Sequence, residues 1–313
     1  MESLTLLNTI GKTPLVELRN MSPKRGIQIY AKLEGQNPTG SVKDRIAKRM
    51  IEAAEQDGSL NKRITILEPT SGNTGISLAF VARLKGYKVK VVMPDNVSPE
   101  RTQLLQAYGA EIVYSDGSYG TNGAIEVAKE MMEQAKDNDY FMPYQYGNEA
   151  NPGAHYETTG SEIIADLPGV DVFVAGLGTG GTLMGVGRRL KEHRSSIKVM
   201  AVAPEHDEAI QGLRDLEEGF VPPILDLALL DSRIMAGTMD AFRGTQELLR
   251  QEGIFAGISS GSVIWAAMRT AERMEKGKIV CLLADGGWKY LSTGLWNKDL
   301  EQMKGEAQGK IWW

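Results

Sequence analysis

The segment VAGLGTGGTL, residues 174–183, has four glycines within six positions. It follows an apolar run typical of a strand, and it opens a segment with helical spacing. A glycine-rich turn between a strand and a helix presents backbone N–H groups and the positive end of the helix dipole, and both favour a bound anion. The rest of the sequence must show whether the ligand is a dinucleotide, a single phosphate or nothing.

Short β-rich runs alternate with longer amphipathic runs along the chain. Strands are predicted at 27–33, 63–69, 87–94, 110–115, 171–178, 196–204 and 278–285. Helices are predicted at 44–58, 73–86, 98–109, 121–136, 183–193, 240–253 and 261–277. This alternation predicts an α/β fold with mostly parallel, twisted sheets flanked by helices.

The alternation is interrupted at 141–152, FMPYQYGNEANP, a stretch rich in turn-forming residues. We therefore expect two α/β domains. The smaller, mobile one covers 35–148, and the larger one combines 1–34 with 149–313. The segment before Ile27 is less regular and is expected to cross between the domains.

Composition excludes several classes of protein. The 313 residues carry a net charge of −5 with both signs mixed, which argues against a nucleic-acid partner. No apolar run is long enough to span a membrane, and the N-terminus does not resemble a signal peptide. The single cysteine, Cys281, lies in an apolar run and is expected to be a buried structural thiol. We expect a cytoplasmic protein.

The histidines do not indicate a metal site. His155, His193 and His206 are widely spaced and match no metal-ligand pattern, so we expect no bound metal. His155 is expected to be a hydrogen-bonded structural residue.

The glycine-rich turn also fits a dinucleotide fingerprint. Gly176, Gly178 and Gly181 have the spacing G-x-G-x-x-G, and the next predicted strand is followed by Glu205. In that fingerprint the acidic residue lies about 20 residues on, and the turn belongs to the first strand–turn–helix unit of its domain. Glu205 comes late, so the turn alone supports a dinucleotide and a monophosphate about equally, ahead of a purely structural turn.

A lysine begins the predicted helix at 44–58. NPTGSVKDR, residues 37–45, puts Lys43 in the first turn, where the helix dipole disfavours a cation. Repulsion and burial would lower the pKa of Lys43 and free its amine for Schiff-base chemistry. The alternative is a solvated surface lysine.

A second strand-to-helix turn is rich in hydrogen-bonding side chains. EPTSGNTG, residues 68–75, could satisfy a bound carboxylate through Thr70, Ser71, Asn73 and Thr74. The alternative is an ordinary helix N-cap. A lysine and two anion-binding turns in one chain are more specific evidence for a binding site than any one of these features alone.

Five motifs together resemble a known family. NPTGSVKDR, EPTSGNTGISLA, GLGTGGTLMG, GIFAGISSG and YLSTG are similar, in this order, to those of the cysteine synthases, which are fold-type II (tryptophan synthase β-like) pyridoxal-phosphate enzymes. The resemblance runs from about Thr9 to about Trp296. It implies a homodimer in which Lys43 holds pyridoxal 5′-phosphate as a Schiff base. It also implies that the glycine-rich turn binds the phosphate of that cofactor through Gly178, Thr179, Gly180, Gly181 and Thr182.

The resemblance assigns further contacts. Asn73 is expected to bond the 3′ oxygen of the cofactor and Ser259 its ring nitrogen. A neutral hydroxyl cannot keep that nitrogen protonated as a carboxylate would, which suits β-elimination better than transamination. The substrate carboxylate is expected to lie on Thr70, Ser71, Asn73 and Thr74, with Gln145 reaching it from the other side.

The implied reaction is a β-replacement on an activated serine. Lys43 removes the Cα proton, the side-chain group leaves to give an aminoacrylate, and a sulfur nucleophile adds to form L-cysteine. The sulfur source is sulfide, thiosulfate or a thiocarboxylated carrier protein. The alternatives are O-acetylserine sulfhydrylase, cystathionine β-synthase and threonine deaminase. The last two usually carry a regulatory domain, whereas this chain ends soon after YLSTG. More distant alternatives are a dinucleotide-binding oxidoreductase and a non-catalytic binding module.

The segment QGLRDLEEGFVP, residues 211–222, indicates which serine derivative is used. It is longer than the glycine-rich segment common among acetylserine enzymes, and it resembles that of the O-phosphoserine-dependent, cysteine synthase B-like branch. A guanidinium such as that of Arg214 can grip a phosphate with two parallel hydrogen bonds. The alternative is an exposed Arg214 paired with Asp215, Glu217 or Glu218.

The chain ends in Ile311-Trp312-Trp313 after a polar stretch. Two exposed tryptophans would be costly, so this tail is expected to dock on a surface. It either packs on the body or the partner subunit, or enters the active-site cleft and shields the aminoacrylate from water.

Overall fold

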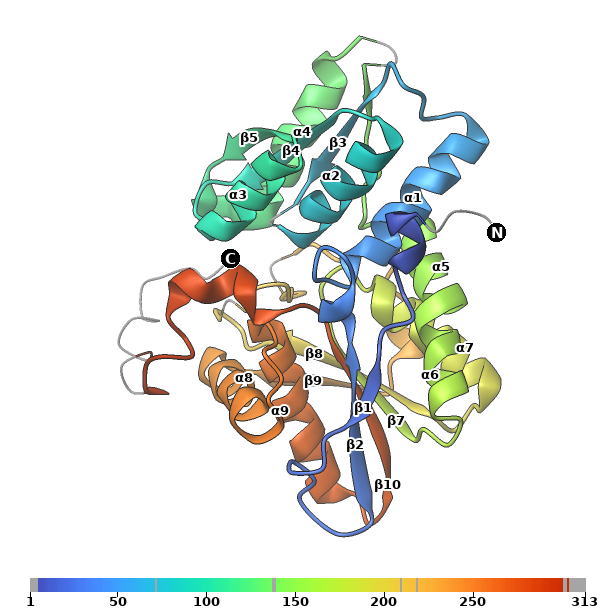
Figure 1. Ribbon diagram of the computed structural model, residues 1–313, viewed down its shortest axis with the longest axis vertical. Coiled ribbons are helices and arrows are strands. Elements are labelled where there is room, and N and C mark those ends of the chain that lie inside the picture. Colours follow the sequence, from blue (N-terminus) through green and yellow to red (C-terminus); the bar gives the residue numbers. More distant parts are fainter. Residues whose placement is uncertain are drawn as a thin grey trace.

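The computed structural model describes residues 5–70, 72–136, 139–208, 210–217, 219–300 and 303. Within these ranges the strands form a larger and a smaller sheet, which occupy different halves of the molecule (Figure 1). The larger sheet has the order β1 (Leu15–Glu17), β2 (Ile27–Leu33), β10 (Gly277–Leu283), β7 (Val172–Gly176), β8 (Lys198–Pro204) and β9 (Ser232–Ala236). The smaller sheet has the order β5 (Glu111–Ser115), β4 (Val89–Pro94), β3 (Thr65–Pro69) and β6 (Tyr140–Phe141).

Strand pairing is parallel throughout the smaller sheet. In the larger sheet the described pairs are parallel except for β1, which runs antiparallel to β2. The predicted α/β class with mostly parallel sheets is therefore confirmed.

Helices cover both sheets (Figure 1). Those packed around the smaller sheet are α1 (Lys43–Asp57), α2 (Asn73–Lys85), α3 (Pro99–Ala107) and α4 (Gly120–Gln134). One face of the larger sheet carries α5 (Ala150–Ala154), a π-helical turn (His155–Gly160), α6 (Ser161–Asp166) and α7 (Gly181–His193). The other face carries α8 (Thr238–Glu252) and α9 (Ile258–Arg273).

Alternating side chains of the central strands pack on opposite faces of the larger sheet. In β7, Val172 and Val174 belong to the core beneath α8 and α9, whereas Phe173 and Ala175 belong to the core beneath α7. This follows from the two-residue period of a strand, and it explains why strands covered on both faces are continuously apolar. Cys281 of β10 is buried in the first core, as predicted, and burial raises the pKa of its thiol.

The elements that the sequence pattern missed are short or interrupted. β1 and β9 are short edge strands, and the helical segment 150–166 contains a π-helical turn and two glycines. The stretch 141–152, predicted to be irregular, contains the end of β6 and the start of α5. All strands of the smaller sheet in the described chain lie inside the expected 35–148 domain, whose boundaries stay a prediction.

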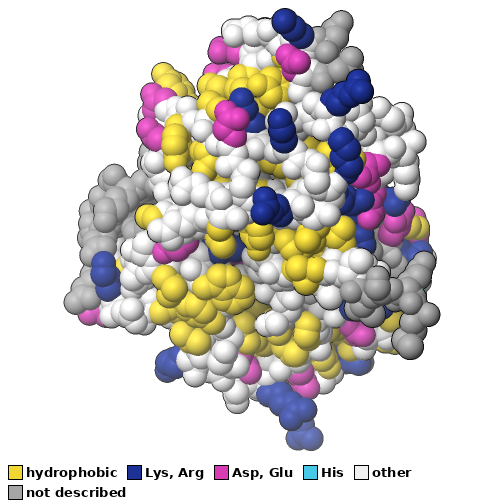
Figure 2. Space-filling model, turned by 45° about the horizontal axis from the view of Figure 1, so that its top comes forward, with side chains coloured by type: hydrophobic (Ala, Val, Ile, Leu, Met, Phe, Trp, Pro, Cys, Tyr) yellow, Lys and Arg dark blue, Asp and Glu magenta, His cyan; other side chains and the backbone are white. Residues whose placement is uncertain are grey.

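The face of the molecule in Figure 2 carries both charged and apolar side chains. On the face in Figure 2, Lys and Arg side chains are interspersed with Asp and Glu, and apolar side chains lie between them. Across the described chain, no helix is long and apolar enough to cross a membrane. The expected docking of the Ile311–Trp313 tail concerns residues outside the described part.

Candidate active site

Loops that follow the parallel strands of both sheets line one cavity. In parallel α/β sheets ligands bind at the carboxyl ends of the strands, because the loops and helix N-termini gather there. This cavity brings together nine of the residues that the sequence singled out. They are Lys43, Thr70, Asn73, Thr74, Gln145, Gly178, Thr179, Arg214 and Ser259. An adjoining cavity adds Gly180 and Thr182, and Gly181 begins α7 beside it. Ser71 lies outside the described residues.

Lys43 is the first residue of α1, and the start of this helix is joined to the end of β10. The Val42 N–H donates to the carbonyl of Ala284 at 2.8 Å, and Ser41 forms a bridge with Asp285. Burial lowers the pKa of Lys43, although Asp285 and Glu34 act to raise it. The lowered pKa, in the direction expected from the sequence, increases the fraction of neutral, nucleophilic amine.

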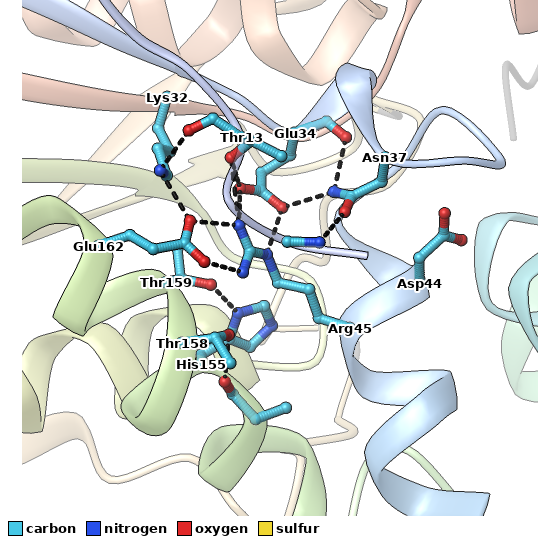
Figure 3. A network of polar contacts seen from close by, with 12 residues as sticks. Thr13, Lys32, Glu34, Asn37, Asp44, Arg45, His155, Thr158, Thr159 and Glu162 are labelled. Carbon is cyan, nitrogen blue, oxygen red and sulfur yellow. Dashed lines mark hydrogen bonds and ion pairs between the residues drawn. The ribbon is translucent and has the colours of Figure 1, made fainter. Parts of the chain in front are cut away.

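A buried ionic network anchors α1 just after Lys43 (Figure 3). Arg45 donates to Glu34 Oε2 at 2.7 Å and to Glu162 Oε1 at 2.7 Å, and Lys32 lies 2.8 Å from Glu162 Oε2. Burial acts to raise the pKa of Glu162, but its bonds to Arg45 and Lys32 prevail and lower it to about 2. Because loss of one partner would leave a buried charge uncompensated, this network holds the helix that carries Lys43.

The glycine-rich turn needs glycine for steric reasons. A Cβ on Gly178 would lie 2.7 Å from the carbonyl oxygen of Gly212, and one on Gly181 would lie 1.9 Å from Asn151 Oδ1. Gly180 has φ +88°, in the left-handed region that favours glycine. The backbone N–H groups at the start of α7 can therefore come close to an anion.

His155 forms a hydrogen bond with Thr182 of the same turn. Its Nδ1 lies 3.0 Å from Thr159 Oγ1, and its Nε2 lies 3.3 Å from Thr182 Oγ1. Burial, together with the charges of Arg45 and Lys43, lowers the pKa of His155 well below its usual value and keeps the ring neutral. The predicted hydrogen-bonded structural role is confirmed, and the contact with Thr182 adds a link to the glycine-rich turn.

The turn between β3 and α2 is linked to Gln145. Thr74 Oγ1 donates to Gln145 Oε1 at 2.6 Å. The buried carboxylate of Glu68 accepts the backbone N–H groups of Tyr144, at 2.8 Å, and Gln145, at 3.1 Å. Burial raises the pKa of Glu68 to about 8, although these two bonds act to lower it. Asn151 links Gln145 to the glycine-rich turn. Its Nδ2 donates to the carbonyl oxygen of Gln145 at 2.8 Å and to Thr179 Oγ1 at 3.1 Å.

Asn73 bonds two residues that the sequence pattern did not single out as site residues, and a third bonds one of these two. Its Nδ2 donates to Asp285 Oδ2 at 2.7 Å, and its Oδ1 accepts from Lys289 Nζ at 2.7 Å. The hydroxyl of Tyr290 also donates to Asp285 Oδ2, at 2.6 Å. The available signal was a lysine between Trp288 and Tyr290, shortly after a buried strand and just before LSTG.

Arg214 lies in the cavity rather than on the surface. It is 8% exposed, and its Nη1 donates to Asn122 Oδ1 at 3.0 Å. Its guanidinium carbon lies 5.2 Å from the ring centre of Tyr146 and 4.7 Å from that of Phe220. These contacts hold the charged group beside the two anion-binding turns.

Two of the three expected alternative partners of Arg214 form ion pairs with other residues. Asp215 lies 3.1 Å from His206 Nδ1, and Glu217 lies 3.8 Å from Arg233. The bond to Asp215 raises the pKa of the exposed His206. Among the described residues no carboxylate forms an ion pair with Arg214, while Glu218 lies outside them.

Comparison with known proteins now identifies the family. The family model described as pyridoxal-phosphate dependent enzyme matches residues 6–285. A cysteine synthase of Staphylococcus aureus is 47% identical over 300 residues, which cover 93% of this chain and 96% of the relative. The chain belongs to the cysteine synthase family.

Solved structures of similar proteins agree with this membership. O-acetylserine sulfhydrylase isoform 3 from Entamoeba histolytica superimposes with a TM-score of 0.86 at 36% identity, covering 98% of this chain and 96% of that one. O-ureido-L-serine synthase superimposes with a TM-score of 0.88 at 38% identity, and the match covers 97% of this chain and 100% of the synthase. This member of the cysteine synthase family has the fold of the type II pyridoxal-phosphate enzymes, and its cofactor is pyridoxal phosphate.

The residues of the cavity fit this cofactor. Lys43 is partly buried, and the lowered pKa of its amine would suit reaction with the aldehyde of the cofactor. The glycine-rich turn lines the adjoining cavity with Gly178, Thr179, Gly180 and Thr182, and it packs too closely against Gly212 for a side chain at Gly178. Ser259, in the first turn of α9, lines both cavities and offers a neutral hydroxyl.

Proposed function

We propose that this protein forms L-cysteine by β-replacement on an activated serine, and that O-phospho-L-serine is its preferred donor. Membership of the cysteine synthase family supports the β-replacement. The surroundings of Arg214 support the choice of donor.

Bound pyridoxal phosphate supplies electron withdrawal from the α-carbon of the substrate. The amine of Lys43 removes the α-proton, and its lowered pKa favours the neutral form that can accept one. Thr70, Thr74 and Gln145, which share the cavity with Lys43, hold the substrate carboxylate. As the family resemblance implies, the hydroxyl of Ser259, which lines the cavity, would contact the ring nitrogen of the bound cofactor.

The observation that carries the donor preference is a buried guanidinium without a carboxylate partner in the described chain. A charge removed from water is costly unless it meets an opposite charge or strong hydrogen-bonding groups. In the described chain the neighbours of Arg214 are the amide of Asn122 and the aromatic residues Tyr146 and Phe220, which carry no negative charge to balance the guanidinium. A phosphate dianion would satisfy both the charge and the forked geometry, whereas an acetyl ester offers only a neutral carbonyl.

The test compares kcat/KM for O-phosphoserine and O-acetylserine with sulfide in excess. Charge-assisted hydrogen bonds contribute about 1.5–3 kcal/mol each, so Arg214→Ala should lose at least about tenfold with phosphoserine. Its kcat/KM with acetylserine should change by less than about threefold. Arg214→Lys, which keeps the charge but not the fork, should lie between wild type and Arg214→Ala.

Arg188→Ala, on the exposed side of α7, is the matched control and should leave both donors unaffected. Equal losses with the two donors in Arg214→Ala would mean that Arg214 only shapes its loop. The donor would then be acetylserine, as the name of the Entamoeba histolytica neighbour suggests.

The sulfur nucleophile and the oligomeric state are further parts of the proposal. Rates with sulfide, thiosulfate, a thiocarboxylated carrier protein and homocysteine separate the cysteine synthases from cystathionine β-synthase.

A homodimer is supported by the exposed side chains of Leu6 and Leu84, which border a hollow with Phe80 and Tyr108. Sedimentation of the purified protein measures its mass in solution.

A further inference from the structure

We propose that Lys289 is a positioning residue that holds the amide of Asn73 with its N–H end toward the cofactor. The inference depends on pyridoxal phosphate occupying the cavity and not on which activated serine is the substrate.

Lys289 lies behind the cavity. Asn73 and Lys43 line the cavity, whereas Lys289 is not among the residues that line it, and its side chain is fully buried. Lys289 belongs to the 3₁₀ segment Gly287–Thr293, and its Nζ bonds the amide oxygen of Asn73. It can therefore act on the ligand only through another residue.

The hydrogen bonds around Asn73 define which end of its amide faces which neighbour. The ammonium of Lys289 can only donate, and it is 2.7 Å from the amide oxygen. The carboxylate of Asp285 accepts, and it is 2.7 Å from the amide nitrogen. A reversed amide would set donor against donor at Lys289 and acceptor against acceptor at Asp285.

This arrangement leaves one N–H of Asn73 for the cavity. The amide nitrogen carries two hydrogens, and Asp285 takes one of them. Because the amide oxygen is held by Lys289, the oxygen cannot turn toward the cavity. Asn73 thus presents a donor, which is what the 3′ oxygen of the cofactor requires.

The charge of Lys289 is supported by its surroundings. Burial lowers the pKa of Lys289 to about 8, while the carboxylates of Asp285 and Asp44 act to raise it. Arg101 and Lys43 are close enough to act in the lowering direction. At neutral pH the side chain therefore remains an ammonium that donates to Asn73.

Replacing Lys289 by methionine would disturb Asn73 in two ways. The amide oxygen would lose its donor, and the buried carboxylate of Asp285 would lose a nearby cation. Because methionine has no donor that would oppose the N–H end of a reversed amide, the reversed orientation would become accessible. The cofactor would meet an acceptor where it needs a donor.

The experiment is a double-mutant cycle on cofactor affinity, measured without substrate. All proteins carry Lys43→Ala, so that the cofactor binds reversibly. The added changes are Lys289→Met, Asn73→Ala and both together. Stripped protein is titrated with pyridoxal 5′-phosphate, and thermal unfolding of each protein checks its fold.

Lys289→Met should weaken cofactor binding about tenfold when Asn73 is present, and by less than about twofold when Asn73→Ala is also present. Lys289→Arg should restore most of the affinity because it keeps a charged donor. Lys276→Met, at an exposed lysine, is the control and should have no effect.

Equal weakening in both Asn73 backgrounds, or none in either, would overturn the proposal, since a merely structural lysine does not act through Asn73. If Lys289→Met does not fold, Lys289→Leu, which also lacks a donor, takes its place in the cycle with the same expected coupling. The cycle uses no donor substrate, so a failure of the phosphoserine proposal would leave its result unchanged.

Discussion

The two anion-binding turns of the cavity differ in chemistry, although each joins the carboxyl end of a parallel strand to a helix. The turn between β7 and α7 packs its backbone closely against other segments of the chain at Gly178 and Gly181, where no Cβ fits. The turn between β3 and α2 works through side chains, with Thr74 bonded to Gln145.

The difference matches the two ligands that we propose for these turns. A cofactor phosphate stays in place, and backbone N–H groups hold it without ordering long side chains. A substrate carboxylate must bind and leave at every turnover. Side chains carried by the smaller sheet can adjust when it does.

The largest effect is expected at the lysine between the two turns. Lys43→Ala should lower turnover on the order of 10⁴-fold, because the base that moves the α-proton is lost. The purified variant should hold no cofactor covalently after borohydride treatment, as measured by mass spectrometry. Lys48→Ala on the same helix is the control. Near-normal turnover in Lys43→Ala would exclude the proposed chemistry.

In the glycine-rich turn, Gly178→Ala should weaken cofactor binding about 10- to 100-fold. The new Cβ would lie 2.7 Å from the carbonyl of Gly212, so one backbone segment must shift. The measurement is cofactor titration of the stripped protein. Gly153→Ala, where no atom lies within 4 Å of the new Cβ, should bind the cofactor normally. Normal binding in Gly178→Ala would place the phosphate elsewhere.

In the side-chain turn, Thr74→Val should raise KM about tenfold for both serine donors and leave cofactor affinity unchanged. The substitution removes the 2.6 Å hydrogen bond that holds Gln145. Steady-state kinetics and cofactor titration measure the two effects separately. Thr65→Val on β3 serves as the control. Loss of cofactor at unchanged KM would contradict the division between the turns.

The smallest effect concerns pH. The pKa of Glu68, beside the side-chain turn, is raised to about 8 from 4.5, so the folded state binds more protons than the unfolded state between these values. The free energy of unfolding should therefore fall as the pH rises through this range.

His155, beneath the glycine-rich turn, has the opposite sign. Its pKa lies well below 6.5, so stability should be lost as the pH falls below 6.5. Urea unfolding at several pH values measures both effects. Glu68→Gln should flatten the slope between pH 5 and 8, whereas Glu126→Gln, at an exposed carboxylate, should not. An unchanged slope in Glu68→Gln would assign the pH dependence to other groups.

Much of the fold could be predicted because its units are local. A strand, a glycine-rich or hydroxyl-rich turn and a helix lie consecutively in the chain, so periodicity and turn chemistry indicate them before any packing is known. β1 and β9 escaped prediction because a short edge strand is defined mainly by its neighbour, β2 or β8.

The sequence by itself determined which functional groups are available to a ligand: the amine of Lys43, two anion-binding turns and the guanidinium of Arg214. Only the tertiary structure decided how these groups are held. Asn73 meets Lys289 across 216 residues of chain, and Arg214 meets Asn122 across 92. Such partners depend on how two sheets and their loops pack together, which no local pattern of residues encodes. The orientation of an amide and the burial of a charge are therefore properties of the folded cavity.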